Sequence, residues 1–314
     1  MGQQGGANHI KTAVNPRFAS FLIHHLRTIH IRSTDSTLLT TMAVRNTDVQ
    51  SISDEDIVFM CTCPSSQTLD GSRRVVKITP HLVVKFGQNV TREEDRNQRF
   101  AYQRLRPYVV IPKVHRYFER QRYVAPEQFD GMFLHHGYTI TLGYLVMDYV
   151  EGEVLNHQNY HESMPMVLKV IEEMQNIESE VPGPTGTGPS RGIFWEDDYP
   201  AFENKGQLED WINERLHLGG TRSSLSSLPL VFCHGDLALR NILRTPDGSI
   251  CLLDWYSAGF YPRIFELCIL ELRSLTTAEE GFNNALIQSF VISDQESSEL
   301  AMIKRAWGNS QRFA

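Results

Sequence analysis

Residues 230–243 read Leu-Val-Phe-Cys-His-Gly-Asp-Leu-Ala-Leu-Arg-Asn-Ile-Leu, and residues 244–255 read Arg-Thr-Pro-Asp-Gly-Ser-Ile-Cys-Leu-Leu-Asp-Trp. Two apolar segments flank the tight-turn sequence Pro246-Asp247-Gly248, a pattern that predicts a β-hairpin. Folding back at this turn places Asn241, at the start of the first strand, near Asp254, at the end of the second. The stretch therefore predicts that two oxygen-bearing side chains converge at one end of a hairpin.

The polar residues of this stretch are of the types that phosphoryl transfer requires. The amide oxygen of Asn241 and the carboxylate of Asp254 are ligands of the kind that Mg²⁺ prefers. Asp236 lies on the loop that enters the hairpin and reaches the same cleft without being a metal ligand. A metal ion neutralises phosphate oxygens while a carboxylate accepts the proton of the attacking hydroxyl. Asp236 is therefore the candidate base, and Asn241 and Asp254 are the candidate metal ligands.

The pattern His-x-Asp-x-x-x-x-Asn, followed by Leu-Asp-Trp at a strand end, resembles the aminoglycoside phosphotransferase and choline kinase group, which is related to protein kinases. In this chain the pattern consists of His234, Asp236, Asn241 and residues 253–255. Residues 258–262 are also similar to the corresponding segment of fungal proteins of this group. The resemblance extends over roughly residues 53–275. It implies an ATP- and Mg²⁺-dependent enzyme that transfers the γ-phosphate to a small-molecule hydroxyl.

The resemblance also implies an α+β fold of the protein-kinase-like, bilobal type. A small lobe would hold an antiparallel β-sheet with one helix, and a larger lobe would be mainly helical. Strand-like runs precede helical ones along the chain, an order that favours this arrangement. The expected divisions are a disordered extension over 1–50, a nucleotide-binding lobe over 51–148, and a catalytic and substrate-binding lobe over 149–314.

Local patterns predict the other elements. Capping boxes at Ser53 and Thr91 begin helices, and Pro107 ends the second of them. The remaining expected elements are strands over 75–78, 82–86 and 138–150, a variable loop over 120–137, helices from 165 onward and over 207–218, and a flexible connector over 182–189.

The remaining nucleotide-binding residues follow from the resemblance. Lys85 matches the strand lysine that holds the α- and β-phosphates, and its alternative role is that of a solvent-facing strand lysine. Glu94 matches the helix glutamate that pairs with this lysine, although a helix-cap role also fits it. Residues 145–150 match the hinge between the lobes, where the adenine-binding candidates are Met147, Asp148 and Tyr149, the last two acting through backbone groups.

Three further residues are expected around the catalytic loop. The resemblance implies that His234 orients this loop through hydrogen bonds. Glu266 stands where the family carries an acidic residue that braces the loop, or is a surface glutamate. Arg240 departs from the His-Pro-Gly of many family members, and it lies near the transferred phosphate or pairs with a neighbouring acid.

Two absences distinguish the sequence from a protein kinase. No Gly-x-Gly-x-x-Gly loop precedes the first predicted strand, and no Ala-Pro-Glu follows Asp254. The cover of the nucleotide phosphates is therefore left open. The alternative function is a nucleotide-binding scaffold or regulatory protein with little or no catalysis on the same fold.

The amino-acid composition limits the binding partners and the cellular compartment that we expect. The 314 residues carry a net charge of −7, which gives no support to binding of nucleic acid or an anionic membrane. The five cysteines lack zinc-ligand spacing and are expected to be reduced thiols, so we expect a cytoplasmic protein. Residues 1–34 lack Asp and Glu, which suggests a mitochondrial presequence, an unstructured tail or a true start at Met42.

The substrate and the oligomeric state stay open at this point. Acidic clusters at Glu172-Glu173 and at residues 196–198 would attract an amine-bearing substrate, or are solvated surface charge. Aminoglycosides, choline-like alcohols, homoserine and sugars are all compatible with the sequence.

Overall fold

The computed structural model describes residues 49–63, 66–69, 74–125, 137–195, 198–216, 220–274 and 279–313. They belong to one compact unit, Thr47–Ala314. The predicted disorder of residues 1–48 and the predicted loop over 126–136 lie outside the described residues. Val49–Ser51 is a short 3-10 helix in which Val49 is buried, so the prediction of disorder up to residue 50 is wrong for these first described residues.

A five-stranded antiparallel sheet has the order β1-β2-β3-β5-β4. Its strands are β1 (Gln67–Thr68), β2 (Val75–Thr79), β3 (Leu82–Gly87), β4 (Val114–Val124) and β5 (Tyr138–Asp148). The predicted hairpin over 75–86 is confirmed as the β2–β3 pair.

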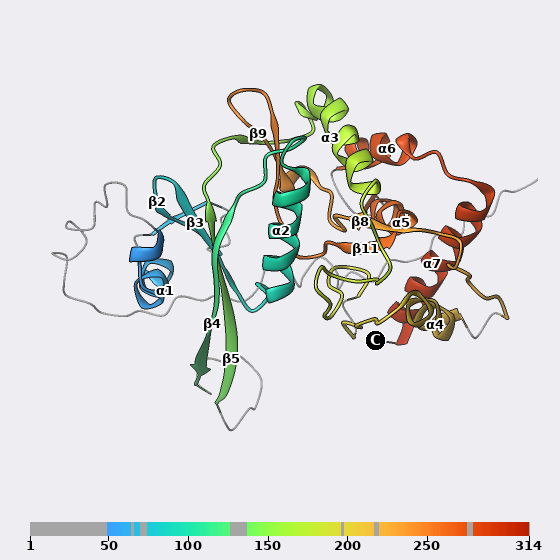
Figure 1. Ribbon diagram of the computed structural model, residues 1–314, viewed down its shortest axis with the longest axis horizontal. Coiled ribbons are helices and arrows are strands. Elements are labelled where there is room, and N and C mark those ends of the chain that lie inside the picture. The colour runs from blue at the N-terminus through green and yellow to red at the C-terminus, as the bar shows by residue number, and fades with distance from the viewer. Residues whose placement is uncertain are drawn as a thin grey trace, which may run out of the picture. The chain divides into compact units, whose positions relative to one another are not determined.

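Strands β4 and β5 run side by side as a long hairpin (Figure 1). Their pairing continues as far as Val124 and Tyr138, so the prediction of a loop over 120–137 is wrong for residues 120–124. The outer half of β4 is rich in charged residues and mostly exposed on both faces. It therefore lacks the alternation of buried and exposed residues by which a half-buried strand is detected.

Two helices belong with this sheet; both were predicted from their capping boxes, although the fold implied by the resemblance assigns one helix to this lobe. Helix α1 (Asp54–Thr62) is capped by the Ser53 side chain and packs through Ile57 and Cys61 against sheet residues. Helix α2 (Arg92–Leu105) is capped by Thr91. The last turns of α2 bury Ala101 and Leu105 in the larger core formed by the rest of the chain. Helix α2 thus links the sheet to the region that follows it through its packing in the larger core.

The later region contains two small antiparallel sheets and mostly helices. The sheets have the orders β10-β9-β6 and β11-β8-β7. The strands are β6 (Glu153–Val154), β7 (Glu178–Ser179), β8 (Leu230–Cys233), β9 (Ile242–Arg244), β10 (Ile250–Leu252) and β11 (Gly259–Pro262). The helices are α3 (Tyr160–Gln175), α4 (Lys205–Leu216), α5 (Ile264–Ser274), α6 (Glu280–Ser289) and α7 (Asp294–Phe313).

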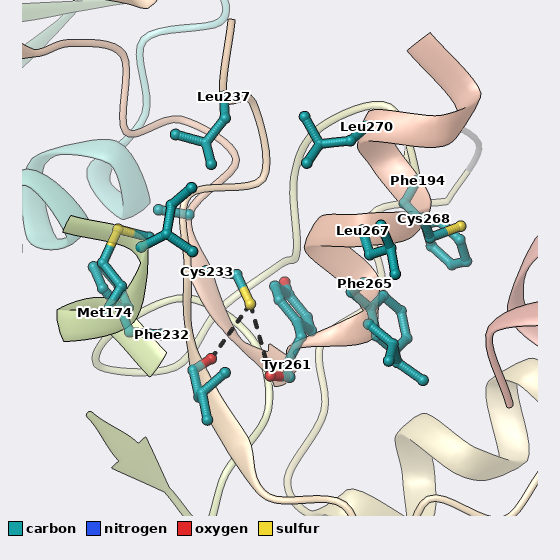
Figure 2. Packing of buried hydrophobic residues seen from close by; sticks show 14 of the residues in the cluster. Met174, Phe194, Phe232, Cys233, Leu237, Tyr261, Phe265, Leu267, Cys268 and Leu270 are labelled. Carbon is teal, nitrogen blue, oxygen red and sulfur yellow. Dashed lines mark hydrogen bonds between the residues drawn. The ribbon is translucent and has the colours of Figure 1, made fainter. Parts of the chain in front are cut away.

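The larger hydrophobic core surrounds strand β8, which leads directly into the catalytic loop predicted from sequence. All four residues of β8 are buried. Figure 2 shows the Cys233 thiol among aromatic and aliphatic side chains, directed toward the carbonyl oxygens of Val231 and Tyr261. None of the five cysteines forms a disulfide, and four of them are buried, as expected for small hydrophobic residues. In the described ranges, no helix combines the length and apolar character that crossing a bilayer would require.

Candidate active site

The predicted catalytic hairpin is formed by β9 and β10. Ile242 pairs with Leu252, and one residue further out the Leu253 backbone N–H donates to the Asn241 carbonyl over 2.9 Å. The turn between the strands is held by Asp247, whose carboxylate accepts hydrogen bonds from Thr245 Oγ1 and the Ser249 backbone N–H. This register places Asn241 and Asp254 at the same end of the hairpin.

Lys85 lies between two carboxylates that come from distant parts of the chain. Its Nζ is 2.6 Å from Glu94 Oε1 on α2 and 2.9 Å from Asp254 Oδ1 beyond β10. Burial alone would lower the pKa of the ammonium, but the charges of Asp254 and Glu94 raise this pKa above its ordinary value. Lys85 is therefore a cation at neutral pH, held by both acids.

Glu94 is fully buried, and it is the acid of the first helical turn that faces Lys85. Burial raises its pKa, and the nearby Lys85 charge opposes this rise. Only Oε1 contacts the lysine; Oε2 is buried and has no hydrogen-bond partner among the described residues. The Glu94 backbone N–H also donates to the Thr91 side chain, so the cap and the ion pair coexist.

Asp254 has the features of a residue held for function. Its φ of +63° lies in the left-handed region, which non-glycine residues rarely occupy. Burial would raise the pKa of this carboxyl, but Lys85, with further help from the Tyr256 backbone N–H, holds the pKa below its usual range. The side chain keeps 36% of its surface exposed. An ionised carboxylate is thus presented to the site.

Asn241 presents its amide oxygen from the other strand of the hairpin. Its Nδ2 donates to the Asp236 carbonyl and to Asp236 Oδ2, both over 2.8 Å. These bonds fix the amide so that Nδ2 faces the loop, and Oδ1 accepts no hydrogen bond from the described residues. One carboxylate and one amide oxygen suit Mg²⁺, which takes few protein ligands and completes its shell with water and phosphate oxygens. The described residues contain no cluster of three or more His, Cys, Asp or Glu side chains that would form a denser metal site.

Asp236 lies in a second cluster of charges on the loop between β8 and β9. Its carboxylate accepts hydrogen bonds from Arg240 and Arg273 as well as from Asn241. Arg240 thus pairs with a neighbouring acid, one of the two alternatives left open by the sequence. Arg273, on α5, is buried and also lies 3.8 Å from Glu279.

The backbone of the catalytic loop is held by His234 and Glu266. The His234 ring contacts the Leu253 carbonyl through Nε2 and accepts from the Asp236 backbone N–H through Nδ1. Burial lowers the pKa of this imidazole, which favours its neutral form. The Glu266 carboxylate accepts hydrogen bonds from the backbone N–H groups of His234 and Gly235. Burial raises the pKa of Glu266 to about 7.

Gly235 is required between these two polar residues. Its φ is +72°, and a Cβ at this position would lie 2.5 Å from the Ser257 carbonyl oxygen. A larger residue would therefore clash with backbone just beyond Asp254, which ties the catalytic loop closely to the end of the hairpin.

The hinge candidates lie at the end of β5, with their backbone amides already engaged. The Asp148 N–H donates to the Lys113 carbonyl, and the Tyr149 N–H donates to the His81 carbonyl. The Asp148 side chain contacts His115 Nε2 over 2.6 Å, and Met147 Sδ accepts a hydrogen bond from Gln98. An adenine ring would have to use other backbone groups of this segment. Its binding here stays a prediction.

Asn97 is a site residue that the sequence interpretation missed. It is fully buried on α2, one helical turn after Glu94. Its Nδ2 donates to the carbonyls of Trp255 and Ala258, and its Oδ1 accepts from both the backbone N–H and the hydroxyl of Thr185. Asn97 therefore joins three segments: the helix of Glu94, the chain after Asp254 and the glycine-rich connector.

Arg273 was missed as well, because nothing in its local sequence points to Asp236, 37 residues away. A polar residue on the apolar helix α5 was the available signal. A buried arginine requires an acidic partner, so a search for acids near its helix would have found the contact.

The acidic clusters considered for substrate attraction are largely paired within the protein. Glu172 and Glu173 lie within 3.0 Å and 2.8 Å of Lys169 on the surface of α3. Asp198 contacts Arg215 and the Trp211 indole N–H, whereas residues 196–197 lie outside the described ranges. Glu172 and Glu173 share one lysine and so keep one excess negative charge, whereas the charge of Asp198 is balanced by Arg215.

Comparison with known proteins gives a sequence match that extends over most of the chain. The model of a phosphotransferase enzyme family matches residues 67–297, well over half of the chain. Ethanolamine kinase 2 of Mus musculus is 29% identical over 140 residues, which are 39% of this chain and 34% of the relative. The matched part thus spans about a third of this curated relative.

The solved structures that match this chain share little sequence with it. A thermostable mutant of aminoglycoside phosphotransferase APH(4)-Ia is 14% identical with a TM-score of 0.47, covering 76% of this chain and 80% of its own. The choline kinase LicA from Streptococcus pneumoniae is 18% identical with a TM-score of 0.41, covering 82% and 88%. A choline/ethanolamine kinase family protein from Mesorhizobium loti is 13% identical with a TM-score of 0.42, covering 82% and 84%.

Proposed function

Because the chain belongs to the phosphotransferase enzyme family, we propose that it is a small-molecule kinase with the protein-kinase-like α+β fold predicted from the sequence. It transfers the γ-phosphate of ATP to a hydroxyl of the acceptor. The convergence of Lys85, Glu94 and Asp254 carries this proposal, since three charges from separate elements meet at the end of the catalytic hairpin. A scaffold that binds no nucleotide would not need a partly exposed carboxylate held in a disfavoured backbone conformation.

The nucleotide would lie between the five-stranded sheet and the hairpin. Lys85 would contact phosphate oxygens, and Glu94 would hold the ammonium in place from the buried side. Asn241 Oδ1 and the Asp254 carboxylate would hold Mg²⁺. When bound, this ion would neutralise charge on the phosphate oxygens.

Asp236 would orient the acceptor hydroxyl and accept its proton. The hydroxyl oxygen would form a bond to the γ-phosphorus while the bond from that phosphorus to the ADP oxygen breaks. His234, Gly235 and Glu266 would fix the backbone that carries Asp236. His234 would act by positioning and not by proton abstraction, because both of its ring nitrogens are engaged by backbone groups of Leu253 and Asp236.

The acceptor is proposed only at the level of a small molecule with a hydroxyl group. The ethanolamine kinase relative makes amine-bearing alcohols the first compounds to test. A cytoplasmic location is likewise proposed, without membrane or nucleic-acid partners.

An acceptor screen tests the proposal directly. Purified full-length protein with ATP and Mg²⁺ is incubated with amino alcohols, aminoglycosides, hydroxyl amino acids and sugars, and ADP release is measured. We expect acceptor-dependent release with at least one class. The same reaction with Asp236→Asn should be slower by about 10²- to 10⁴-fold, the contribution of a positioned base. Equal turnover by Asp236→Asn would contradict the proposed role of this residue.

A further inference from the structure

The carboxylate of Asp236 has no unused hydrogen-bond capacity in this structure. Oδ1 accepts from Arg240 Nη2 over 2.8 Å and from Arg273 Nη1 over 2.7 Å. Oδ2 accepts from the same Arg240 nitrogen over 2.6 Å and from Asn241 Nδ2 over 2.8 Å. A carboxylate offers about four acceptor sites, two on each oxygen. All of them are taken, so an acceptor hydroxyl can bond to Asp236 only if one donor leaves.

The three donors differ in how firmly they are held. The Arg273 side chain is only 8% exposed, and its guanidinium also bonds the Leu237 carbonyl and lies near Glu279. The Asn241 amide is buried and bonds the Asp236 carbonyl too. Arg240, by contrast, keeps 54% of its side chain exposed. Its guanidinium bonds only Asp236 among the described residues, so it is the donor that can leave most easily.

Displacement of Arg240 from Asp236 also costs little free energy. More than half of the Arg240 side chain is exposed, so water solvates its guanidinium once it moves away from the partly buried Asp236. The charge of Asp236 stays compensated after Arg240 moves away, since Arg273 and Asn241 remain. Rotation of Arg240 therefore exposes the carboxylate without leaving a buried, unpaired charge.

We propose that Arg240 is a latch that covers Asp236 until an acceptor displaces it. This inference rests on the proposed kinase activity and adds a selectivity step to it. With the latch closed, Asp236 cannot orient a water molecule, so hydrolysis of ATP is suppressed. In that hydrolysis, water oxygen bonds to the γ-phosphorus, the bond to ADP breaks, and the water proton passes through Asp236 to solvent, giving ADP and phosphate.

The test needs ATP and Mg²⁺ only, and no knowledge of the acceptor. Phosphate release without acceptor is measured for the wild-type protein and for Arg240→Gln, with folding checked by thermal unfolding. We expect release to rise about fivefold, the factor at the upper end of the range for a surface ion pair. Arg240→Lys, which keeps the charge but ends in a compact ammonium in place of the guanidinium, should give an intermediate rise.

Two further variants test whether the rise in hydrolysis comes from the contact between Arg240 and Asp236. Arg244→Gln changes an exposed arginine of the same hairpin that pairs with Glu162, and it should leave hydrolysis unchanged. In the double variant Arg240→Gln/Asp236→Asn, the rise should vanish, because it acts through Asp236. A variant that had merely lost its fold would not show a rise in hydrolysis that depends on Asp236.

The latch is overturned if folded Arg240→Gln hydrolyses ATP no faster than the wild type. It is also overturned if the rise persists in the double variant. These results differ from failure of the proposed function, in which the wild-type protein would neither bind ATP nor transfer phosphate to any acceptor.

Discussion

The two charge clusters at the end of the catalytic hairpin have opposite compositions. Around Lys85, one cation lies between the carboxylates of Glu94 and Asp254. Around Asp236, one carboxylate lies between the guanidinium groups of Arg240 and Arg273. The first cluster carries one excess negative charge, whereas the second is neutral once Glu279 beside Arg273 is included.

This difference assigns different tasks to two chemically similar aspartates. The negative excess around Asp254 favours a divalent cation, because the carboxylate stays ionised and partly exposed. The saturated carboxylate of Asp236 is closed to a metal ion and, until a donor moves, to a hydroxyl. Under the proposed function, the first cluster would bind Mg²⁺, and the second would open when an acceptor displaces Arg240.

The largest expected effect comes from neutralising the first cluster. Asp254→Asn removes the excess charge and should reduce phosphate transfer by about 10³-fold, because metal-ion stabilisation contributes several kcal/mol. Transfer is measured as ADP release over a range of Mg²⁺ concentrations. Asp247→Asn, in the turn of the same hairpin, is the matched control and should retain activity. If Asp254→Asn kept the Mg²⁺ dependence of the wild type, Asp254 would not hold the metal ion, and the proposed difference between the two clusters would be wrong.

The second prediction concerns Glu266, which holds the backbone of the loop that carries Asp236. Glu266 has a pKa of about 7 in the folded protein against 4.5 for the free side chain, owing to burial. Between these values the folded state binds more protons than the unfolded state, so this residue favours folding more at pH 5 than at pH 8. The advantage is complete below pH 4.5 and lost as the pH rises through 7.

Replacement of Glu266 by Gln removes this titration. The free energy of unfolding in urea is compared for the wild type and Glu266→Gln at pH 8 and at pH 5. Relative to the variant, the wild type should gain up to about 3 kcal/mol at the lower pH. A difference that is constant between the two pH values would show that Glu266 titrates as an ordinary surface carboxyl.

The sequence predicts those parts of both clusters that are close together along the chain. His234, Asp236, Asn241 and Asp254 lie within 21 positions of one another, and a turn with a clear signature fixes their register. Lys85 and Glu94 are assigned from their spacing within the family pattern, and the distances agree with their pairing. Local chemistry predicted Asp236, Asn241 and Asp254, whereas Lys85, Glu94 and the role of His234 were implied by the family resemblance.

Contacts between distant segments could not be predicted in this way. Asn97 bonds residues 88 and 158 positions away, and Arg273 reaches Asp236 across the catalytic loop. A single buried Asn or Arg leaves no periodic pattern in the sequence, because its partners are specified by tertiary packing. The same reasoning applies to the hinge, where the engaged amides of Asp148 and Tyr149 depend on strands that come together only in the fold.

The smallest expected effect concerns Thr185, whose hydroxyl bonds Asn97 and so supports the Lys85 cluster. Thr185→Val removes the hydroxyl bond to Asn97 Oδ1 but keeps the backbone N–H bond to the same oxygen. A loss of about 1 kcal/mol of stability follows, or about 2–4 °C in Tm for a domain of this size. Thr185→Ser retains the hydroxyl and should restore most of the loss. Phosphate transfer should hardly change, because Asn97 still holds Trp255 and Ala258 through its Nδ2. A large loss of transfer in folded Thr185→Val would instead show that the Glu94 helix depends on the connector for its position, and that the first cluster is as easily opened as the second.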